Sequence, residues 1–262
     1  MKAFKIITII CAMAALSLAC GRDTDADSSI CATFTVETPL TKAFCDGSLA
    51  TDLSVRVFDA NHNFLYEQTA KRGDAGWEVT LRLVPGTYSF SFWASSPDAD
   101  AFSFNREYMT LSYPLMDMNS NTEDAFWASI ADIELTSEFS RTVTLKRPFA
   151  LLQLVSDSFI NESLEGATSV FSITGSMCTR LNLITGDVDQ ANRKAVYTAA
   201  PISDYTIGRR TIAAAAFVLV PEEEVTVPEV TYNITLKDGR SLDGTVSDVP
   251  LARNHRTNLL DN

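Results

Sequence analysis

Histidine is scarce in this chain of 262 residues, which contains only His62 and His255. This shortage disfavours a histidine-rich zinc site, and it leaves a Ser-His-Asp triad dependent on one of those two residues. The sequence also lacks the GxGxxG, Walker, GxSxG and HExxH patterns of common nucleotide, hydrolase and metalloprotease sites. We therefore expect a protein that is not an enzyme and that uses no cofactor and no metal.

Positive charge is also in short supply. Lys and Arg together number 21 against 33 Asp and Glu, which gives a net charge of −12. Nucleic-acid binding needs a basic surface, so we expect no nucleic-acid partner. Hydrophobic residues make up 46% of the chain and aromatic residues 10%, which is typical of a folded protein rather than a disordered one.

Long apolar runs are absent except near the start of the chain. Ile6 to Leu18 is uncharged and follows Lys2 and Lys5. The run is shorter than the ~20 residues that a membrane-spanning helix needs, and its basic flank is typical of a secretory signal. Leu16 to Cys20 resembles a bacterial lipobox, so we expect residues 1–19 to be a lipoprotein signal peptide and Cys20 to carry lipid. The alternative is an ordinary signal in which Cys20 is incidental.

The cysteines offer little chemistry. Cys11 leaves with the signal and Cys20 takes the lipid, so Cys31, Cys45 and Cys178 remain. An odd number allows one disulfide and a free thiol, or no disulfide at all. No CxxC pair occurs, which excludes a zinc knuckle or redox motif of that kind. The simplest interpretation is three small buried side chains.

Apolar and polar residues alternate in most of the remaining chain, a period typical of strands with one buried face. The segments with this pattern are Ala32–Glu37, Leu53–Val57, Trp77–Leu83, Tyr88–Phe92, Val143–Leu145 and Val230–Leu236. Asp238-Gly239 predicts a two-residue hairpin turn with positive φ at both positions. One short helix is expected over Glu123–Ile130, capped by Asn121 or Thr122.

Short strands with frequent turns predict an all-β fold of antiparallel β-sandwiches. Residues 20–30 are polar and acidic and form an expected tether. Lys146-Arg147-Pro148 interrupts the strand pattern, so we expect one sandwich over residues 31–147 and a second over residues 148–262. Each half has about the size of a seven-stranded sandwich.

Six blocks along the chain form an ordered series behind the lipobox. They are Ala32–Glu37, Thr41–Phe44, Tyr88–Ala94, Val143–Ala150, Leu181–Gly186 and Val249–Asn258. This series resembles the fimbrillin-like surface lipoproteins of Gram-negative anaerobes, in particular a branch described as a domain of unknown function. The likeness extends over about residues 31 to 262.

The resemblance implies two transthyretin-like β-sandwich domains with Greek-key connections, and display on the cell outer membrane through a lipid anchor. In fimbrial members of the family a protease removes the first strand, and a strand from another subunit fills the groove that opens. Such strand addition combines main-chain hydrogen bonds with side-chain pockets that fix the register. The implied partners are other fimbrial subunits, in a homopolymer or heteropolymer, and the implied role includes adhesion.

The family features transfer to this chain only in part. The first strand corresponds to Ala32–Glu37, with Ala32, Phe34 and Val36 as its inward-facing residues, and the processing position corresponds to the Lys42-Ala43 bond. Family processing is best matched by Arg, and an ordinary surface lysine is the alternative for Lys42. The Lys71-Arg72-Gly73 loop is a second cleavable segment, with the same plain alternative.

The tail after Asn258 departs from the family pattern. Leu259-Leu260-Asp261-Asn262 is short and acidic at its end, whereas a donor strand needs several alternating apolar residues. We therefore expect a structural, accessory, tip or anchoring subunit. The alternative is a stand-alone lipid-anchored β-sandwich that binds a host glycan or a host protein at the cell surface.

The remaining polar clusters have plain interpretations. The acidic series Asp23–Asp27 and Asp117–Asn121 lack the Gly and Glu of a calcium loop, and Glu222–Glu224 is typical of a solvated turn. Arg253–Arg256 is a basic cluster without the Gly-rich backbone of a phosphate site.

The three tryptophans leave one binding hypothesis open. Trp77, Trp93 and Trp127 offer either core packing or a platform on which a sugar stacks. Core packing is the default for Trp93, and Trp127 on the expected helix is assigned to the same core. A solvent-exposed tryptophan is the feature that would favour glycan binding.

Overall fold

The computed structural model of the chain describes residues 29–38, 47–111, 123–156, 167–199, 206–207 and 210–261. Its regular elements in these ranges are all β-strands, arranged in four sheets. The all-β sandwich class expected from the sequence is confirmed. Within the described residues, no helix is long and apolar enough to cross a membrane.

The first sandwich is built from two facing sheets. One has the order β4-β1-β9 and the other the order β3-β2-β5-β8. The strands are β1 (Ile30–Glu37), β2 (Asp52–Asp59), β3 (Phe64–Lys71), β4 (Trp77–Leu83), β5 (Gly86–Ser95), β8 (Phe126–Leu135) and β9 (Phe139–Thr144). Alternate residues of both sheets share one core, in which Phe34 of β1, Val55 of β2 and Phe90 of β5 are fully buried. The chain passes between the two sheets at β1–β2, β3–β4, β4–β5 and β8–β9, as a Greek-key sandwich requires.

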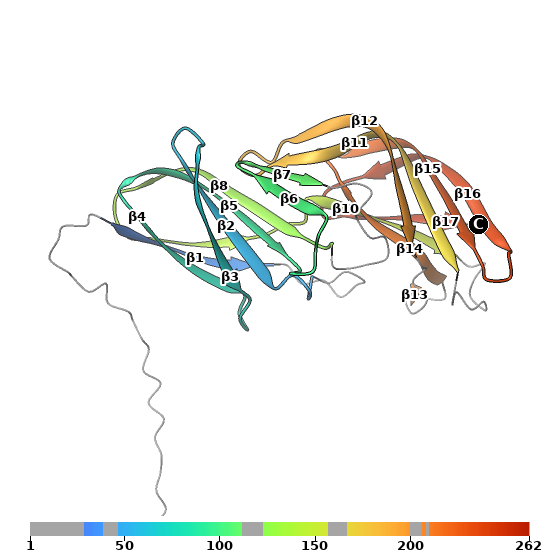
Figure 1. Cartoon of the computed structure of the whole chain (residues 1–262), viewed down its shortest axis with the longest axis horizontal. Helices are drawn as coiled ribbons and strands as arrows, with labels where there is room; N and C mark the ends of the chain where they lie inside the picture. The colour runs from blue at the N-terminus through green and yellow to red at the C-terminus, as the bar shows by residue number, and fades with distance from the viewer. Residues whose placement is uncertain are drawn as a thin grey trace, which may run out of the picture.

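The second sandwich repeats this topology. Its strands are β10 (Phe149–Ser156), β11 (Thr168–Asn182), β12 (Val188–Ala199), β13 (Thr206–Ile207), β14 (Arg210–Leu219), β15 (Val225–Thr235), β16 (Ser241–Leu251) and β17 (Arg256–Asp261). The order β14-β10-β17 matches β4-β1-β9, and β12-β11-β15-β16 matches β3-β2-β5-β8. Figure 1 shows the two sandwiches end to end along the long axis of the molecule.

A hairpin from the first sandwich extends a sheet of the second. It consists of β6 (Phe102–Asn105) and β7 (Tyr108–Leu111), which lie in sequence between β5 and β8. β7 pairs with β11 through Tyr108–Thr110 opposite Arg180–Asn182. The hairpin therefore joins the two sandwiches, in agreement with its position at the middle of Figure 1. The domain boundary near residue 147 stays a prediction, and no sequence pattern indicates that this hairpin docks on the second sandwich.

An aromatic cluster fills the junction beside this hairpin. The Trp93 ring centroid lies 5.1 Å from that of Phe102, 5.5 Å from Phe104 and 6.4 Å from Phe149. Phe149 in turn lies 6.1 Å from Phe217 of β14. These side chains belong to β5, the hairpin, β10 and β14, so apolar packing as well as sheet pairing holds the junction together.

The expected short helix over Glu123–Ile130 is wrong. Phe126 begins β8, which pairs antiparallel with β5 from Gly86↔Leu135 to Ala94↔Phe126. Phe126 and Ile130 are buried in the first core, and this tertiary burial outweighs the local helix signals. The proposed caps, Asn121 and Thr122, lie outside the described residues.

Two further details differ from the sequence expectation. The Asp238-Gly239 hairpin forms, but only Gly239 has positive φ (88°), and Leu236 exchanges its turn hydrogen bonds with Gly239 and Arg240. The turn is therefore a type I turn followed by a left-handed glycine. The sheets are also not purely antiparallel, because β1 pairs parallel with β9 and β10 with β17.

Candidate functional site

The first strand, β1, is anchored in the core by the three residues expected to face inward. Ala32, Phe34 and Val36 each have 0% of their surface exposed. The Phe34 ring centroid lies 4.9 Å from that of Phe90 and 5.1 Å from that of Phe92. Phe34 is therefore the largest inward side chain of β1 and packs on the facing sheet at the centre of the first core.

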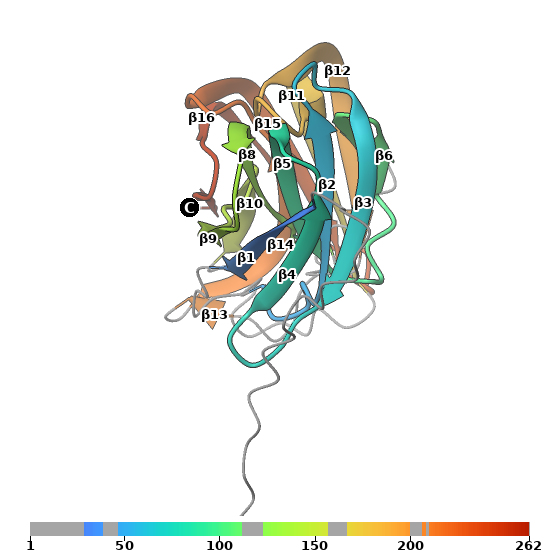
Figure 2. The ribbon, with the colours of Figure 1, turned by 90° about the vertical axis from the view of Figure 1, so that its left-hand side faces the viewer.

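β1 is the middle strand of its sheet, as the end view in Figure 2 shows. On one side it pairs antiparallel with β4, from Ile30↔Leu83 to Val36↔Trp77. On the other side it pairs parallel with β9, from Ala32↔Phe139 to Glu37↔Thr144. Because β1 separates β4 from β9, its departure would leave a groove one strand wide with two unpaired edges and an open core. We call this space the β1 groove.

The outer face of β1 is polar. Thr35 and Glu37 are exposed, and the hydroxyls of Thr33 and Thr80 of β4 are 3.1 Å apart. The strand thus combines one apolar face with one wet face, which is the pattern that fixes a register when a strand enters a groove.

The end of β1 is held by backbone and side-chain contacts. The Glu37 carbonyl accepts a hydrogen bond from the Leu145 N–H at 2.8 Å, and the Thr38 hydroxyl accepts one from Arg72 Nη2 at 3.0 Å. The Arg72 guanidinium also lies 5.0 Å from the centroid of the Trp77 ring. The Arg72 side chain therefore helps to hold the end of β1, which supports a structural role for the Lys71-Arg72-Gly73 loop rather than a role as a cleavage site.

Several predicted site residues lie outside the described residues. These are the lipidation residue Cys20, the processing pair Lys42 and Ala43, Cys45, and the polar series Asp23–Asp27 and Asp117–Asn121. Their roles stay predictions. In sequence, Lys42 falls between the end of β1 at Glu37 and the start of β2 at Asp52.

The three tryptophans do not form one platform. Trp77 is 1% exposed in the first core and Trp93 is 2% exposed in the second. Trp127 is half-buried, and its indole Nε1 donates a hydrogen bond to the Leu183 carbonyl at 3.1 Å. Only Trp127 therefore has solvent-accessible surface available for a ligand.

Trp127 and the first three residues of the basic cluster, Arg253 to His255, line one groove of about 580 Å³ at the junction of the sandwiches. Lys146 and Glu222 also line this space, which we call the junction groove. Sequence reasoning treated Trp127 and Arg253–Arg256 separately. Their meeting depends on the isolated bridge between Trp127 and Lys146 and on the β16–β17 loop, which no local pattern indicates.

Cys178 behaves as a buried small side chain. It is a free cysteine with 3% of its surface exposed, and burial raises the pKa of its thiol to about 11. The thiol is therefore protonated at neutral pH and is a poor nucleophile. In the described part of the chain, no group of three His, Cys, Asp or Glu side chains is placed to hold a metal ion.

Three solved bacterial protein structures share this fold. A candidate polysaccharide-binding protein from Bacteroides thetaiotaomicron aligns with a TM-score of 0.54 and 14% identity over 82% of this chain and 79% of its own. A candidate adhesin from Bacteroides ovatus aligns at 0.54 and 11% identity over 88% and 89%. The fimbrial anchor protein Mfa2 from Porphyromonas gingivalis aligns at 0.51 and 14% identity over 88% and 90%. At these identities the likeness concerns the fold.

A comparison with functionally curated proteins gives no match. The family DUF6562, described as a family of unknown function, matches residues 47–262, which include every strand after β1. That range is most of the sequence, and the chain therefore belongs to the DUF6562 family.

Proposed function

We propose that this chain is a fimbrillin-like surface lipoprotein, a structural or accessory subunit of a fimbria that assembles by strand exchange and supports adhesion. The observation that carries the proposal is the position of β1. It is the middle strand of the sheet β4-β1-β9, and its three inward side chains are fully buried. Along the chain it is joined only to β2, so one cut between Glu37 and Asp52 would separate it from the other strands. The shared fold with a fimbrial anchor protein and with a candidate adhesin supports the same role.

The energetics of the β1 groove favour refilling. Loss of β1 would expose the pockets of Phe34 and Val36, and burial of such side chains contributes about 1.5–3 kcal/mol each. The facing edges of β4 and β9 would also lose the hydrogen bonds that their register gives them with β1. A strand from another subunit, with alternating apolar residues, would restore both the apolar burial and the main-chain hydrogen bonds.

The last strand supports an accepting rather than a donating role. β17 pairs with β10 of the same molecule from Leu151↔Arg256 to Ser156↔Asp261, and Leu259 is 3% exposed. This strand is thus already used within its own sandwich. A subunit that accepts a strand without offering β17 fits an accessory, tip or anchoring position in a filament.

Limited trypsin digestion of the purified full-length protein tests the proposal, with intact mass and native gels as readouts. We expect cleavage after Lys42 and loss of the N-terminal fragment. Because β17 is paired within its own sandwich, the cleaved protein should form a complex only when a donor strand is supplied. Lys42→Gln is the matched control and should not be cut at this position. A Lys42 bond that resists trypsin, or a cleaved protein that keeps its N-terminal fragment, would contradict strand exchange triggered at this position.

Membrane anchoring is tested separately. In the proposal, cleavage before Cys20 leaves this residue as the lipidated N-terminus, and the protein is held at the outer membrane. Cells that express the protein should incorporate labelled palmitate into it, and Cys20→Ala should abolish the label. Equal labelling of both proteins would refute the anchor.

A further inference from the structure

The junction groove lies where the end of the first sandwich meets three loops of the second. Trp127 is the second residue of β8, and Lys146 follows β9. Thr185, Glu222 and Arg253 lie in the loops after β11, β14 and β16. The groove has a volume of about 580 Å³, which is enough for a ligand of a few sugar rings. It is independent of β1 and of the strand exchange proposed above.

An aromatic ring and a cation are placed side by side at one wall of the groove. Trp127 and Lys146 exchange two backbone hydrogen bonds, of 2.8 and 3.0 Å, in an isolated antiparallel bridge. Residues paired in this way face each other directly and have their side chains on the same face of the ladder. The Trp127 indole is oriented by its hydrogen bond to the Leu183 carbonyl, and Lys146 is exposed.

A second cation stands against the same ring. The Arg253 guanidinium carbon lies 6.0 Å from the centroid of the Trp127 ring. Arg253 Nε donates to the Val220 carbonyl at 2.8 Å and Nη2 to the Gly186 carbonyl at 2.7 Å. Neutral carbonyls thus fix the position of the guanidinium, and the carboxylates of Glu222 and Asp187 interact with its charge. An arginine has five N–H donors, so others remain for a ligand.

The charge of the groove runs against that of the chain. Arg147, which also lines it, is neutralised by a bidentate pair with Asp124 at 2.6 and 2.8 Å. Within the part of the chain that the structure describes, neither Lys146 nor Arg253 forms such an ion pair. Lys146 and Arg253 line the groove with the carboxylate of Glu222, and the carboxylates of Glu222 and Asp187 both act on the Arg253 charge. Lys146 is therefore the exposed cation of the groove, in a protein whose net charge is −12. An exposed cation beside an aromatic ring favours an anionic ligand.

From this arrangement we propose that the junction groove binds an anionic oligosaccharide, with a sugar ring against Trp127 and its carboxylate or sulfate group at Lys146 and Arg253. Aromatic side chains bind the apolar C–H face of a sugar, and polar groups at the rim orient the ligand. Thr185 and Asn254 supply such groups. A neutral sugar would leave Lys146 without an anionic group beside it.

Titration of the purified full-length protein with defined oligosaccharides tests the site. The probes are trigalacturonic acid, which carries carboxylates, a chondroitin sulfate hexasaccharide, which also carries sulfates, and the neutral galactotriose. Calorimetry gives the affinity, and tryptophan fluorescence reports the site because Trp77 and Trp93 are buried. We expect saturable binding of at least one anionic probe with a change in emission, and no binding of galactotriose.

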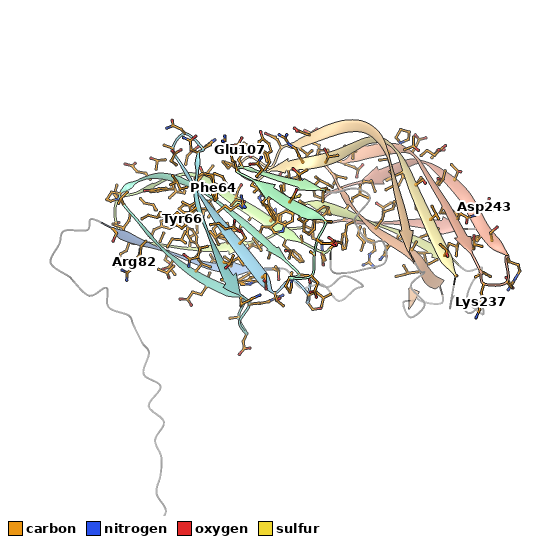
Figure 3. The ribbon with its side chains drawn as sticks, viewed as in Figure 1. Phe64, Tyr66, Arg82, Glu107, Lys237 and Asp243 are labelled. Carbon is orange, nitrogen blue, oxygen red and sulfur yellow. The ribbon has the colours of Figure 1, made fainter. Side chains whose placement is uncertain are left out.

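Lys146→Glu is the decisive variant, because this side chain is exposed and its replacement leaves the cores intact. It should weaken binding at least about fivefold, since reversing a charge beside an anion replaces attraction by repulsion. Lys237→Glu is the matched control. Lys237 is an exposed lysine in the β15–β16 hairpin, far from the junction at the right of Figure 3, and its change should leave the affinity unaltered.

Trp127→Phe serves as a second variant and should remove the ligand-dependent change in emission. The anionic probe that binds identifies whether a carboxylate suffices or a sulfate is required, and either result supports the site. Absence of binding by both anionic probes would overturn the proposal. Equal binding of galactotriose, or equal weakening by Lys146→Glu and Lys237→Glu, would overturn it as well.

Discussion

Replacement of Phe34 by alanine should destabilise the first sandwich strongly. Phe34 is fully buried, and its ring lies 4.9 Å from Phe90, 5.1 Å from Phe92 and 5.9 Å from Phe139, measured between centroids. Truncation of a buried Phe costs about 3–5 kcal/mol, from lost transfer free energy and from the cavity left behind. The three neighbouring rings belong to both facing sheets, so relaxation cannot easily close the cavity, and we expect the upper half of this range.

Urea unfolding followed by tryptophan fluorescence measures this effect, because Trp77 reports on the same core. With a slope of about 2 kcal/mol/M, a loss of 4–5 kcal/mol lowers the unfolding midpoint by about 2 M. Thr35→Ala is the matched control, since Thr35 is the exposed neighbour of Phe34 on the same strand, and its change should stay within about 0.5 kcal/mol. A loss below about 1 kcal/mol for Phe34→Ala would refute the claim that this side chain holds β1 in place.

Three further predictions concern other parts of the fold. Gly76→Ala should lower the melting temperature more than Gly239→Ala. Both glycines have positive φ (109° and 88°), but only a Cβ at Gly76 would collide with the β1 backbone. Equal shifts in the melting temperature would contradict this contact. Asp124→Ala should lower the free energy of unfolding by about 3–5 kcal/mol, since it removes the carboxylate paired with the buried guanidinium of Arg147. The double variant with Asp124→Leu and Arg147→Met removes both charges, and chemical denaturation should show that it recovers most of the loss. Burial raises the pKa of Cys178 from 9 to about 11, so the folded state holds this proton more tightly than the unfolded state. The free energy of unfolding should therefore fall as the pH rises from about 9 to 11. Cys178→Ala should remove this contribution to the pH dependence.

Local alternation was sufficient to predict the strands that have one buried and one wet face. β4 runs from Trp77 to Leu83 as expected, and each of its odd-numbered residues is buried. The inward set of β1 follows from the same period of two. In these strands the alternation of apolar and polar residues along the sequence identifies the buried face, so the strand can be predicted without knowing its partner.

Features that depend on distant partners could not be read in this way. Phe126–Leu135 forms β8 because β5 offers a sheet edge and a core, whereas the local signals favoured a helix. The parallel pairing of β1 with β9 joins residues more than a hundred positions apart, and the docking of β7 on β11 crosses from one sandwich to the other. The junction groove likewise brings together Trp127, Lys146 and Arg253 from distant parts of the chain, so its residues appeared in the sequence only as separate fragments.

Strand capture by the cleaved protein tests the central claim most directly. After trypsin cleavage at Lys42 and removal of the released fragment, a fluorescent peptide with the sequence of residues 30–37 is added, alongside the same peptide with Phe34→Asp. The account predicts stable, stoichiometric capture of the first peptide and none of the second, because only the first refills the pocket between β4 and β9. Failure to capture either peptide, or equal capture of both, would contradict assembly through the β1 groove.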